Sequence, residues 1–210
     1  MKYYEIIPEA KEGADNLVCK LDEKTLRIGW NTASGDNAFD FTPNDFDWGK
    51  PIEGWPEGVT FFYEKKEGDM VPDYFCSDFS FLLFSKKAVD GLKVCQKKEF
   101  ELLHASLLET KEEMRDESYK IVNVINVIDV IDWEYSNYSK ISIDKEDGNG
   151  EIFYNMMIKP VFKKDELESI RPHIFKTKDD EAPVYVSEEF KNYCEREKLT
   201  GFEFYEIKQR

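Results

Sequence analysis

Basic residues are scarce in this sequence. It contains 29 Lys and Arg against 44 Asp and Glu, which gives a formal net charge of −15. Binding to nucleic-acid phosphates requires clustered Lys and Arg, and anionic membrane surfaces repel an acidic chain, so we expect neither as a partner. Acidity attracts basic proteins, although many bacterial cytosolic proteins are acidic for solubility alone.

Histidine is also rare, because only His104 and His173 are present and neither lies in a recognisable catalytic motif. A hydrolytic triad needs an oriented histidine beside a nucleophile and a carboxylate. Alternation along residues 100–105 places His104 on the same face as Phe100 and Leu102, which predicts a buried, structural histidine. Nothing in the sequence supports catalysis by His173, and we expect no catalytic residues.

Paired cysteines and glycine-rich phosphate loops are missing. The four cysteines form no Cys-x-x-Cys pair; they are Cys19, Cys76, Cys95 and Cys194. Structural zinc sites use Cys and His in close pairs, so we expect no metal and no cofactor. Disulfides are typical of small secreted chains, whereas this chain is neither small nor visibly secreted. Reduced, partly buried thiols are therefore predicted, with Cys95 and Cys194 facing the core.

The sequence has no long hydrophobic run. The longest candidate, residues 121–133, is interrupted by Asn and Asp and is shorter than the roughly 20 residues that cross a bilayer. The first nine residues lack the apolar core of a secretory signal. These absences lead us to expect a cytoplasmic protein that does not bind membranes.

Enough apolar residues are present for a sizeable core, at 41% of the chain with 15% aromatic. Hairpin patterns combined with a few helices predict an α+β fold with a mixed, mainly antiparallel sheet and two or three helices. We expect residues 1–70 to form an N-terminal strand-and-loop region packed on a main α+β domain of residues 71–210. The β-branched run 119–133 is expected to be one long central strand, bent near Asn126.

A pattern of strand, capping serine, helix and strand occurs twice. In residues 183–204, Ser187 follows a strand and precedes a helix. Ser85 lies 102 positions before Ser187, and Phe100 lies the same distance before Phe202. The recurrence indicates either a duplicated strand-helix-strand unit or a coincidence of capping rules.

Two segments also carry a family resemblance. The stretches VYVSEEFKNYCEREKLTGFEF (184–204) and NVINVIDVIDW (123–133) resemble signatures of an immunity-protein family from bacterial polymorphic toxin systems, formerly classed as a domain of unknown function. The resemblance covers residues 72–207. It implies a cytoplasmic, non-catalytic protein that neutralises a cognate toxin by occluding its active site.

Two acidic segments are candidates for the partner surface. Asp129 and Asp132 interrupt an Ile/Val run, and charge there is costly unless it is solvated or paired. They could bond turn amides, act as acid–base groups or face a basic partner. The second segment is an acidic-aromatic stretch free of Lys and Arg between Arg27 and Lys50, whose aromatics could give contact area or fill the core. The candidate partner-binding residues are Asp40, Asp45, Asp47, Trp48, Asp129, Asp132, Trp133 and Ser136.

Two other functions stay open at this point. The chain could be an enzyme, for example a carboxylate-based hydrolase, or a non-catalytic scaffold module that binds peptides along an exposed strand edge. For an immunity protein we expect a cognate toxin domain, basic in character, as the partner. The sequence identifies neither this toxin nor the oligomeric state.

Overall fold

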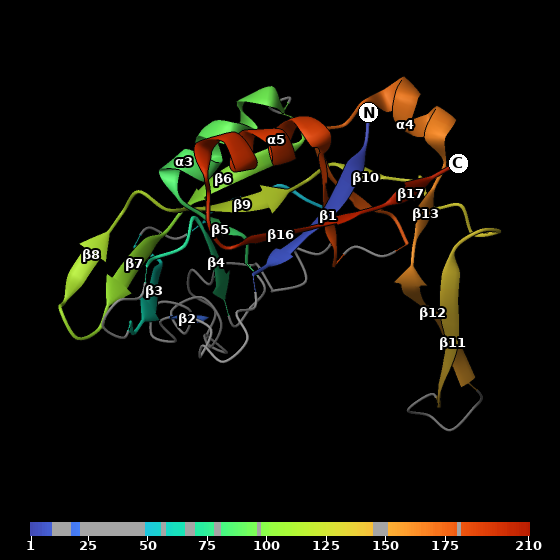
Figure 1. Cartoon of the computed structure of the whole chain (residues 1–210). Helices are drawn as coiled ribbons and strands as arrows, with labels where there is room; N and C mark the ends of the chain where they lie inside the picture. Colours follow the sequence, from blue (N-terminus) through green and yellow to red (C-terminus); the bar gives the residue numbers. More distant parts are fainter. Residues whose placement is uncertain are drawn as a thin grey trace.

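The computed structural model is an α+β fold in which most strand pairs are antiparallel, as predicted from the sequence (Figure 1). It describes residues 1–9, 18–21, 49–55, 58–65, 70–77, 81–95, 98–144, 151–179 and 182–210, of which 18–21, 76–77, 140–144 and 151–156 are described by backbone alone. The α-helices of this part of the chain are α3 (Lys86–Gly91), continued by the 3₁₀ turn η1 (Leu92–Val94), α4 (Lys164–Ile170) and α5 (Glu188–Glu197).

Two sheets contain most of the described strands. The larger has the order β6-β9-β5-β4-β2-β3-β7-β8, with bounds Phe100–His104, Lys120–Val124, Leu83–Phe84, Tyr74–Ser77, Val18–Leu21, Thr60–Tyr63, Ser106–Glu109 and Met114–Asp116. The smaller has the order β10-β14-β15-β1-β16, with bounds Val127–Ile128, Ile174–Thr177, Val184–Ser187, Tyr3–Pro8 and Phe202–Glu206. Outside them, β11 (Asn137–Asp144) and β12 (Glu151–Lys159) form a hairpin, and β13 (Val161–Phe162) pairs with β17 (Lys208–Gln209).

The prediction of one long central strand over residues 119–133 is wrong, although the predicted bend near Asn126 is present. The run is divided between β9 in the larger sheet and β10 in the smaller sheet. The chain bends at Ile125 and Asn126, whose backbone amides both donate to the carbonyl oxygen of Glu99 at 3.0 and 3.1 Å. The Asn126 side chain also donates to the Ile174 carbonyl oxygen at 3.1 Å. These bonds fix the bend, so β-branched propensity does not carry the strand through it.

The two sheets contain a structural repeat. The first repeat is β2-β4-β5-β9-β6 with α3, and the second is β10-β14-β15-β1-β16 with α5; both have the same order and the same parallel and antiparallel pairs. Their registers also agree. Phe100 pairs with Val124 as Phe202 pairs with Pro8, and the agreement continues along both strand pairs. The serine pattern in the sequence therefore reflects a repeat of five strands and a helix, larger than strand-helix-strand.

The N-terminal strand β1 belongs to the second repeat, and the equivalent strand β9 belongs to the first, which is a strand exchange between the two halves of the chain. β1 lies between β15 and β16, whereas β9 lies between β5 and β6. β2 follows β1 in the sequence but pairs in the larger sheet, and β10 follows β9 but pairs in the smaller sheet. As a result, residues 1–70 contribute strands to both sheets.

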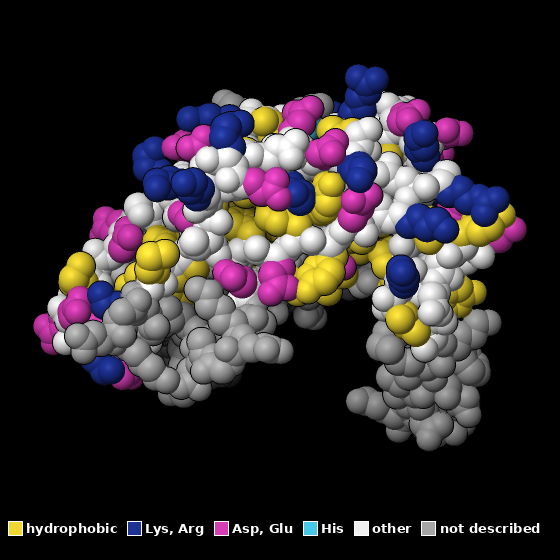
Figure 2. Space-filling view, viewed as in Figure 1, with side chains coloured by type: hydrophobic (Ala, Val, Ile, Leu, Met, Phe, Trp, Pro, Cys, Tyr) yellow, Lys and Arg dark blue, Asp and Glu magenta, His cyan; other side chains and the backbone are white. Residues whose placement is uncertain are grey.

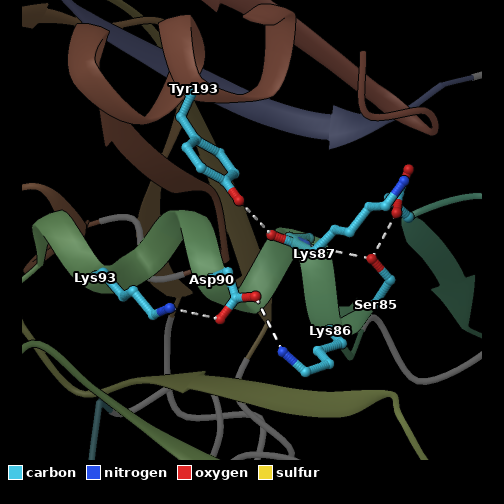
Figure 3. Close-up of polar contacts among 8 residues, drawn as sticks. Ser85, Lys86, Lys87, Asp90, Lys93 and Tyr193 are labelled. Carbon is cyan, nitrogen blue, oxygen red and sulfur yellow. Dashed lines mark hydrogen bonds and ion pairs between the residues drawn. The ribbon is translucent and has the colours of Figure 1, made fainter. Parts of the chain in front are cut away.

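Helices α3 and α5 lie side by side and pack against each other (Figure 1, Figure 3). Gly91 and Tyr193 occupy equivalent positions and touch, since a Cβ atom on Gly91 would lie 2.5 Å from Tyr193 Cδ1. The Tyr193 hydroxyl donates to the Lys87 carbonyl oxygen at 3.1 Å. Contact between equivalent residues is what an approximate two-fold axis produces. The core beneath both helices includes the stacked rings of Phe84 and Phe190.

Two further sequence predictions can be compared with the fold. Cys194 is buried and Cys95 half-buried in the core shared by the two repeats, and both are free thiols, as predicted. His104 is exposed, so its predicted burial is wrong. The buried face of β6 includes Leu103, whereas Leu102 is 44% exposed, because the strand presents the opposite set of alternating residues to the core.

Candidate functional site

The acidic-aromatic stretch cannot be placed on the surface. Its four candidate residues, Asp40, Asp45, Asp47 and Trp48, lie outside the described residues. Residues 50–55, which follow this stretch, contact the first repeat. There the Ile52 amide donates to Glu101 Oε1 at 2.7 Å, and Trp55 Nε1 donates to the His104 carbonyl oxygen at 2.8 Å.

Asp132 and Ser136 stabilise a turn. Asp132 Oδ1 accepts a hydrogen bond from the Glu134 amide at 3.2 Å, and the Asp132 carbonyl oxygen accepts one from the Ser136 amide at 2.9 Å. Ser136 Oγ then accepts the Val161 amide at 2.8 Å, which joins the turn to β13. This is the first of the three roles considered for the acids of this segment, and it explains Asp132 without a partner.

Asp129 precedes that turn, and Trp133 lies within it. The Asp129 side chain is 61% exposed and lies 3.6 Å from Lys163 Nζ, a weak surface ion pair. Trp133 is half-buried and packs edge-on against Tyr138 at the start of β11, with ring centroids 5.1 Å apart. Of the four residues, Asp129 is therefore the one whose charge a partner could reach directly.

The hairpin β11–β12 extends from the base formed by this turn. Figure 1 shows that it projects away from the sheets on the side opposite α3 and α5. Near its base Ile158 is 55% exposed, and Arg210 stacks on the Tyr135 ring at 3.7 Å. Exposed aromatic, apolar and Arg side chains are typical of protein interfaces.

A second group of polar residues lies where each capping serine meets the residue just before the adjacent strand, β4 in the first repeat and β14 in the second. In the first repeat, Ser85 accepts the Ala88 amide at the start of α3 and donates to Asp73 Oδ1 at 2.6 Å (Figure 3). Asp73 Oδ2 accepts the Thr200 amide at 3.0 Å. The serine, the aspartate and Thr200 thus form a closed set of hydrogen bonds within the chain.

The equivalent place in the second repeat has different chemistry. Here Ser187 caps α5, and the residue that corresponds to Asp73 is His173, whose Nδ1 lies 3.1 Å from Ser187 Oγ. Glu189 Oε2 lies 3.7 Å from the same nitrogen. The His173 amide donates to Glu99 Oε1 at 3.2 Å.

These residues do not form a hydrolytic triad. A triad places the nucleophile and the carboxylate at opposite nitrogens of the imidazole, whereas Ser187 and Glu189 approach the same one. Ser187 is also fully buried as a helix cap, which leaves its hydroxyl out of reach of a substrate.

A half-open cavity of about 510 Å³ lies beside this histidine. Its lining residues include Met1, Tyr3, Leu167, Glu168, Arg171, His173, Glu189 and Gln209. Tyr3 is 1% exposed, and its hydroxyl has no hydrogen-bond partner among the residues that the structure describes. Burial, with a smaller contribution from the Glu99 carboxylate, raises the pKa of Tyr3, so the hydroxyl stays protonated.

Sequence reasoning did not find this cavity. It dismissed His173 and gave no role to Tyr3, Arg171 or Glu189. A signal was available, because Tyr3 and Tyr119 each lie at the start of the strand that completes a repeat, and Pro72 and Pro172 each lie two residues before the following sheet strand. That signal is readable only once the strand exchange is known.

Two further searches covered the residues that the structure describes. Within the described ranges, no three His, Cys, Asp or Glu side chains are grouped so that they could hold a metal ion. The helices placed there are all too short or too polar to cross a bilayer.

Comparison with known proteins identifies the family. No curated protein matches the chain. The model of the immunity protein family (Imm11) matches residues 2–209, and so extends to β1, beyond the segments on which the resemblance was first seen. This match confirms the resemblance, and the chain belongs to the immunity protein family Imm11.

Proposed function

We propose that this protein binds one cognate toxin domain of a bacterial polymorphic toxin system in the cytoplasm and neutralises it by covering its active site. The observation that carries the proposal is the family match over residues 2–209, which makes the chain an immunity protein as a whole. The net charge of −15 supports a basic toxin, because complementary charge speeds encounter and excludes wrong partners.

The side of the hairpin is the best surface for this contact. Lys86, Lys87 and Lys93 lie on or just after α3, and Figure 2 shows Lys and Arg gathered over that helix, which disfavours a basic partner there. The opposite side offers the exposed Asp129, which is paired only weakly with Lys163, and the apolar Ile158. A protruding hairpin is suited to entering a cleft in a partner.

The proposal is of a binder and not of an enzyme. The contacts of Ser187 support this, since its hydroxyl caps α5, and Glu189 approaches the same nitrogen of His173 as Ser187 does, which is not the arrangement that activates a nucleophile. Neutralisation by binding is stoichiometric, whereas an enzyme that modified the toxin would act on many copies.

Co-expression and titration test the proposal. The chain should rescue bacteria from the toxin encoded beside it and not from unrelated toxins, and the purified pair should elute as one complex. Titrated against the toxin's own activity, inhibition should be complete at one equivalent per binding site. Death of the co-expressing cells would reject the proposal, and complete inhibition at a small fraction of an equivalent would favour an enzyme.

A further inference from the structure

The two repeats differ in what covers one face of their last strand pair. In the first repeat, the face of β6 and β9 that lies away from α3 includes Glu101 and Leu103, and the chain's own segment 50–55 packs over it. Leu103 is therefore only 6% exposed. The equivalent of Leu103 in the second repeat is Tyr205, which is 51% exposed. A position that is covered in the first repeat is thus open to a partner in the second.

The covering segment 50–55 is held by hydrogen bonds as well as by packing. The Ile52 amide donates to Glu101 Oε1 at 2.7 Å, while the Ile52 side chain is buried in the core. The indole Nε1 of Trp55 donates to the His104 carbonyl oxygen at 2.8 Å. Because β6 is the last strand of its sheet, this second bond lies at the edge of the sheet.

A turn brings the two bonding residues of this segment to the same strand pair. Gly54 lies directly before Trp55 and has a φ of 72°, a value that favours glycine at the third position of a turn. The Trp55 ring then meets Phe81 edge-on, with ring centroids 6.4 Å apart. The pattern that covers the first repeat is therefore an aliphatic residue, any residue, glycine and tryptophan.

The second repeat presents the same two acceptors. Glu203 occupies the position of Glu101, and the Glu206 carbonyl oxygen occupies that of the His104 carbonyl, since the registers of the two strand pairs agree. β16 is the last strand of the smaller sheet, as β6 is of the larger. The Tyr205 hydroxyl donates to Glu203 Oε2 at 2.6 Å, which holds the ring beside the carboxylate. A second segment of the same pattern would find both acceptors in place.

This face lies on the side of the molecule that the proposed function assigns to the toxin. Ile207 follows Tyr205 by two residues and so lies on the same face of the sheet. It belongs to a core cluster with Phe162, and Trp133 at the base of the hairpin packs against that cluster. Helix α5 packs on the opposite face. Tyr205 and the hairpin are therefore parts of one side, and exposed tyrosines are typical of protein interfaces.

We propose that the toxin covers this face with a short turn segment, placed as residues 50–55 are in the first repeat. A backbone amide of the segment donates to Glu203, an aliphatic side chain packs beside Tyr205, and a tryptophan three residues later donates its indole N–H to the Glu206 carbonyl oxygen. The inference rests on the proposed function, because it identifies part of the toxin that is bound. The first repeat supplies the template, since equivalent strands in the same register hold such a segment there.

A peptide probe tests the face without the toxin. An acetylated and amidated peptide with the sequence of residues 50–55, KPIEGW, is added to the ¹⁵N-labelled full-length protein, and amide shifts are followed by NMR. Saturable shifts should cluster at Glu203, Tyr205 and Glu206. Glu101 should not shift, because the chain's own segment fills that site. A peptide with alanine in place of tryptophan should bind several-fold more weakly. Absence of saturable shifts on this face, or equal binding of the two peptides, would overturn the inference.

Matched variants carry the test to the toxin complex. Tyr205→Ala should weaken toxin binding about tenfold or more, as loss of a central aromatic contact does. Leu102→Ala is its control, because Leu102 is 44% exposed on the equivalent strand β6 but lies on the opposite face from Leu103, and it should leave binding unchanged. Glu203→Gln should weaken binding about three- to tenfold. Glu206→Gln should not, because the Glu206 side chain points to the α5 side of the same strand.

The two levels of the hypothesis fail in different ways. If the wild-type protein binds the toxin and both Tyr205→Ala and Glu203→Gln bind it equally well, the toxin does not use this face and the proposed function still holds. If the wild-type protein forms no complex with the toxin, the proposed function fails, and the inference about this face fails with it.

Discussion

Removal of the two equivalent tyrosine hydroxyls should have opposite effects on stability. Tyr119 is 4% exposed, and its hydroxyl donates to Pro72 at 2.7 Å. Tyr119→Phe should lower the free energy of unfolding by about 1 kcal/mol, the net contribution of one hydrogen bond. Tyr3→Phe removes a buried hydroxyl that has no partner in the described structure, so the free energy of unfolding should stay unchanged or rise by up to about 1 kcal/mol.

Urea denaturation measures both effects against the wild-type protein. Both substitutions leave the aromatic ring in place, so the slope of unfolding free energy against urea should be the same in all three proteins. In thermal unfolding the gap between the variants should be about 2–4 °C or more, which is the shift that 1 kcal/mol gives at this chain length. A loss in Tyr3→Phe as large as that in Tyr119→Phe would show that Tyr3 is paired, and the reasoning about the cavity would be refuted.

Three other predictions concern charge, the turn before the hairpin and a buried thiol. Association with the toxin, followed by stopped flow, should slow markedly as salt rises toward physiological strength, where the screening length is about 8 Å, while dissociation changes less; rates that are flat with salt would exclude charge steering. Ser136→Ala should cost about 1 kcal/mol of stability with little effect on toxin affinity, because Ser136 joins the turn to Val161. Asp129→Asn should instead leave stability within about 0.5 kcal/mol and weaken toxin binding, measured by calorimetry. Burial raises the pKa of Cys194 to about 12, so in a Cys19→Ser, Cys76→Ser, Cys95→Ser background a thiol reagent at pH 8 should react slowly until the protein unfolds; fast reaction would show an accessible thiolate.

Local patterns predicted the elements of the fold well. Ser85 and Ser187 both cap helices, as a serine before a periodic run suggests. The pairing of β11 with β12 follows from two strand-like runs separated by the Gly- and Asp-containing sequence 147–150. These features depend on residues close together in the sequence, which is why one sequence was enough to find them.

Features set by distant contacts were not predictable in the same way. The sequence predicts a bend near Asn126, but the division of residues 119–133 between two sheets depends on contacts with Glu99 and Ile174, which are far away in the sequence. The wrong face was assigned to β6 because alternation gives two faces without saying which one is covered. Asp132 was one of several possible interface acids until its bond to the Glu134 amide showed a turn.

The cavity lay beyond sequence reasoning for a further reason. Tyr3 and His173 are 170 positions apart, and they meet only because β1 crosses into the second repeat. Without the exchange, Tyr3 would be assigned to a separate N-terminal region. An acidic partner surface stays a prediction from composition, and the places of the individual acids depend on this topology.

The repeat also explains why one of the two equivalent sites is open. The same strand order and register put the same groups, a capping serine and a tyrosine hydroxyl, at both sites. In the first repeat, Asp73, Thr200 and Pro72 satisfy these groups from within the chain. In the second repeat, His173 replaces the aspartate and the hydroxyl faces no acceptor in the described residues. Since β1 supplies Tyr3 and the C-terminal half supplies His173, the open site forms only when β1 has paired with the strands of the second repeat.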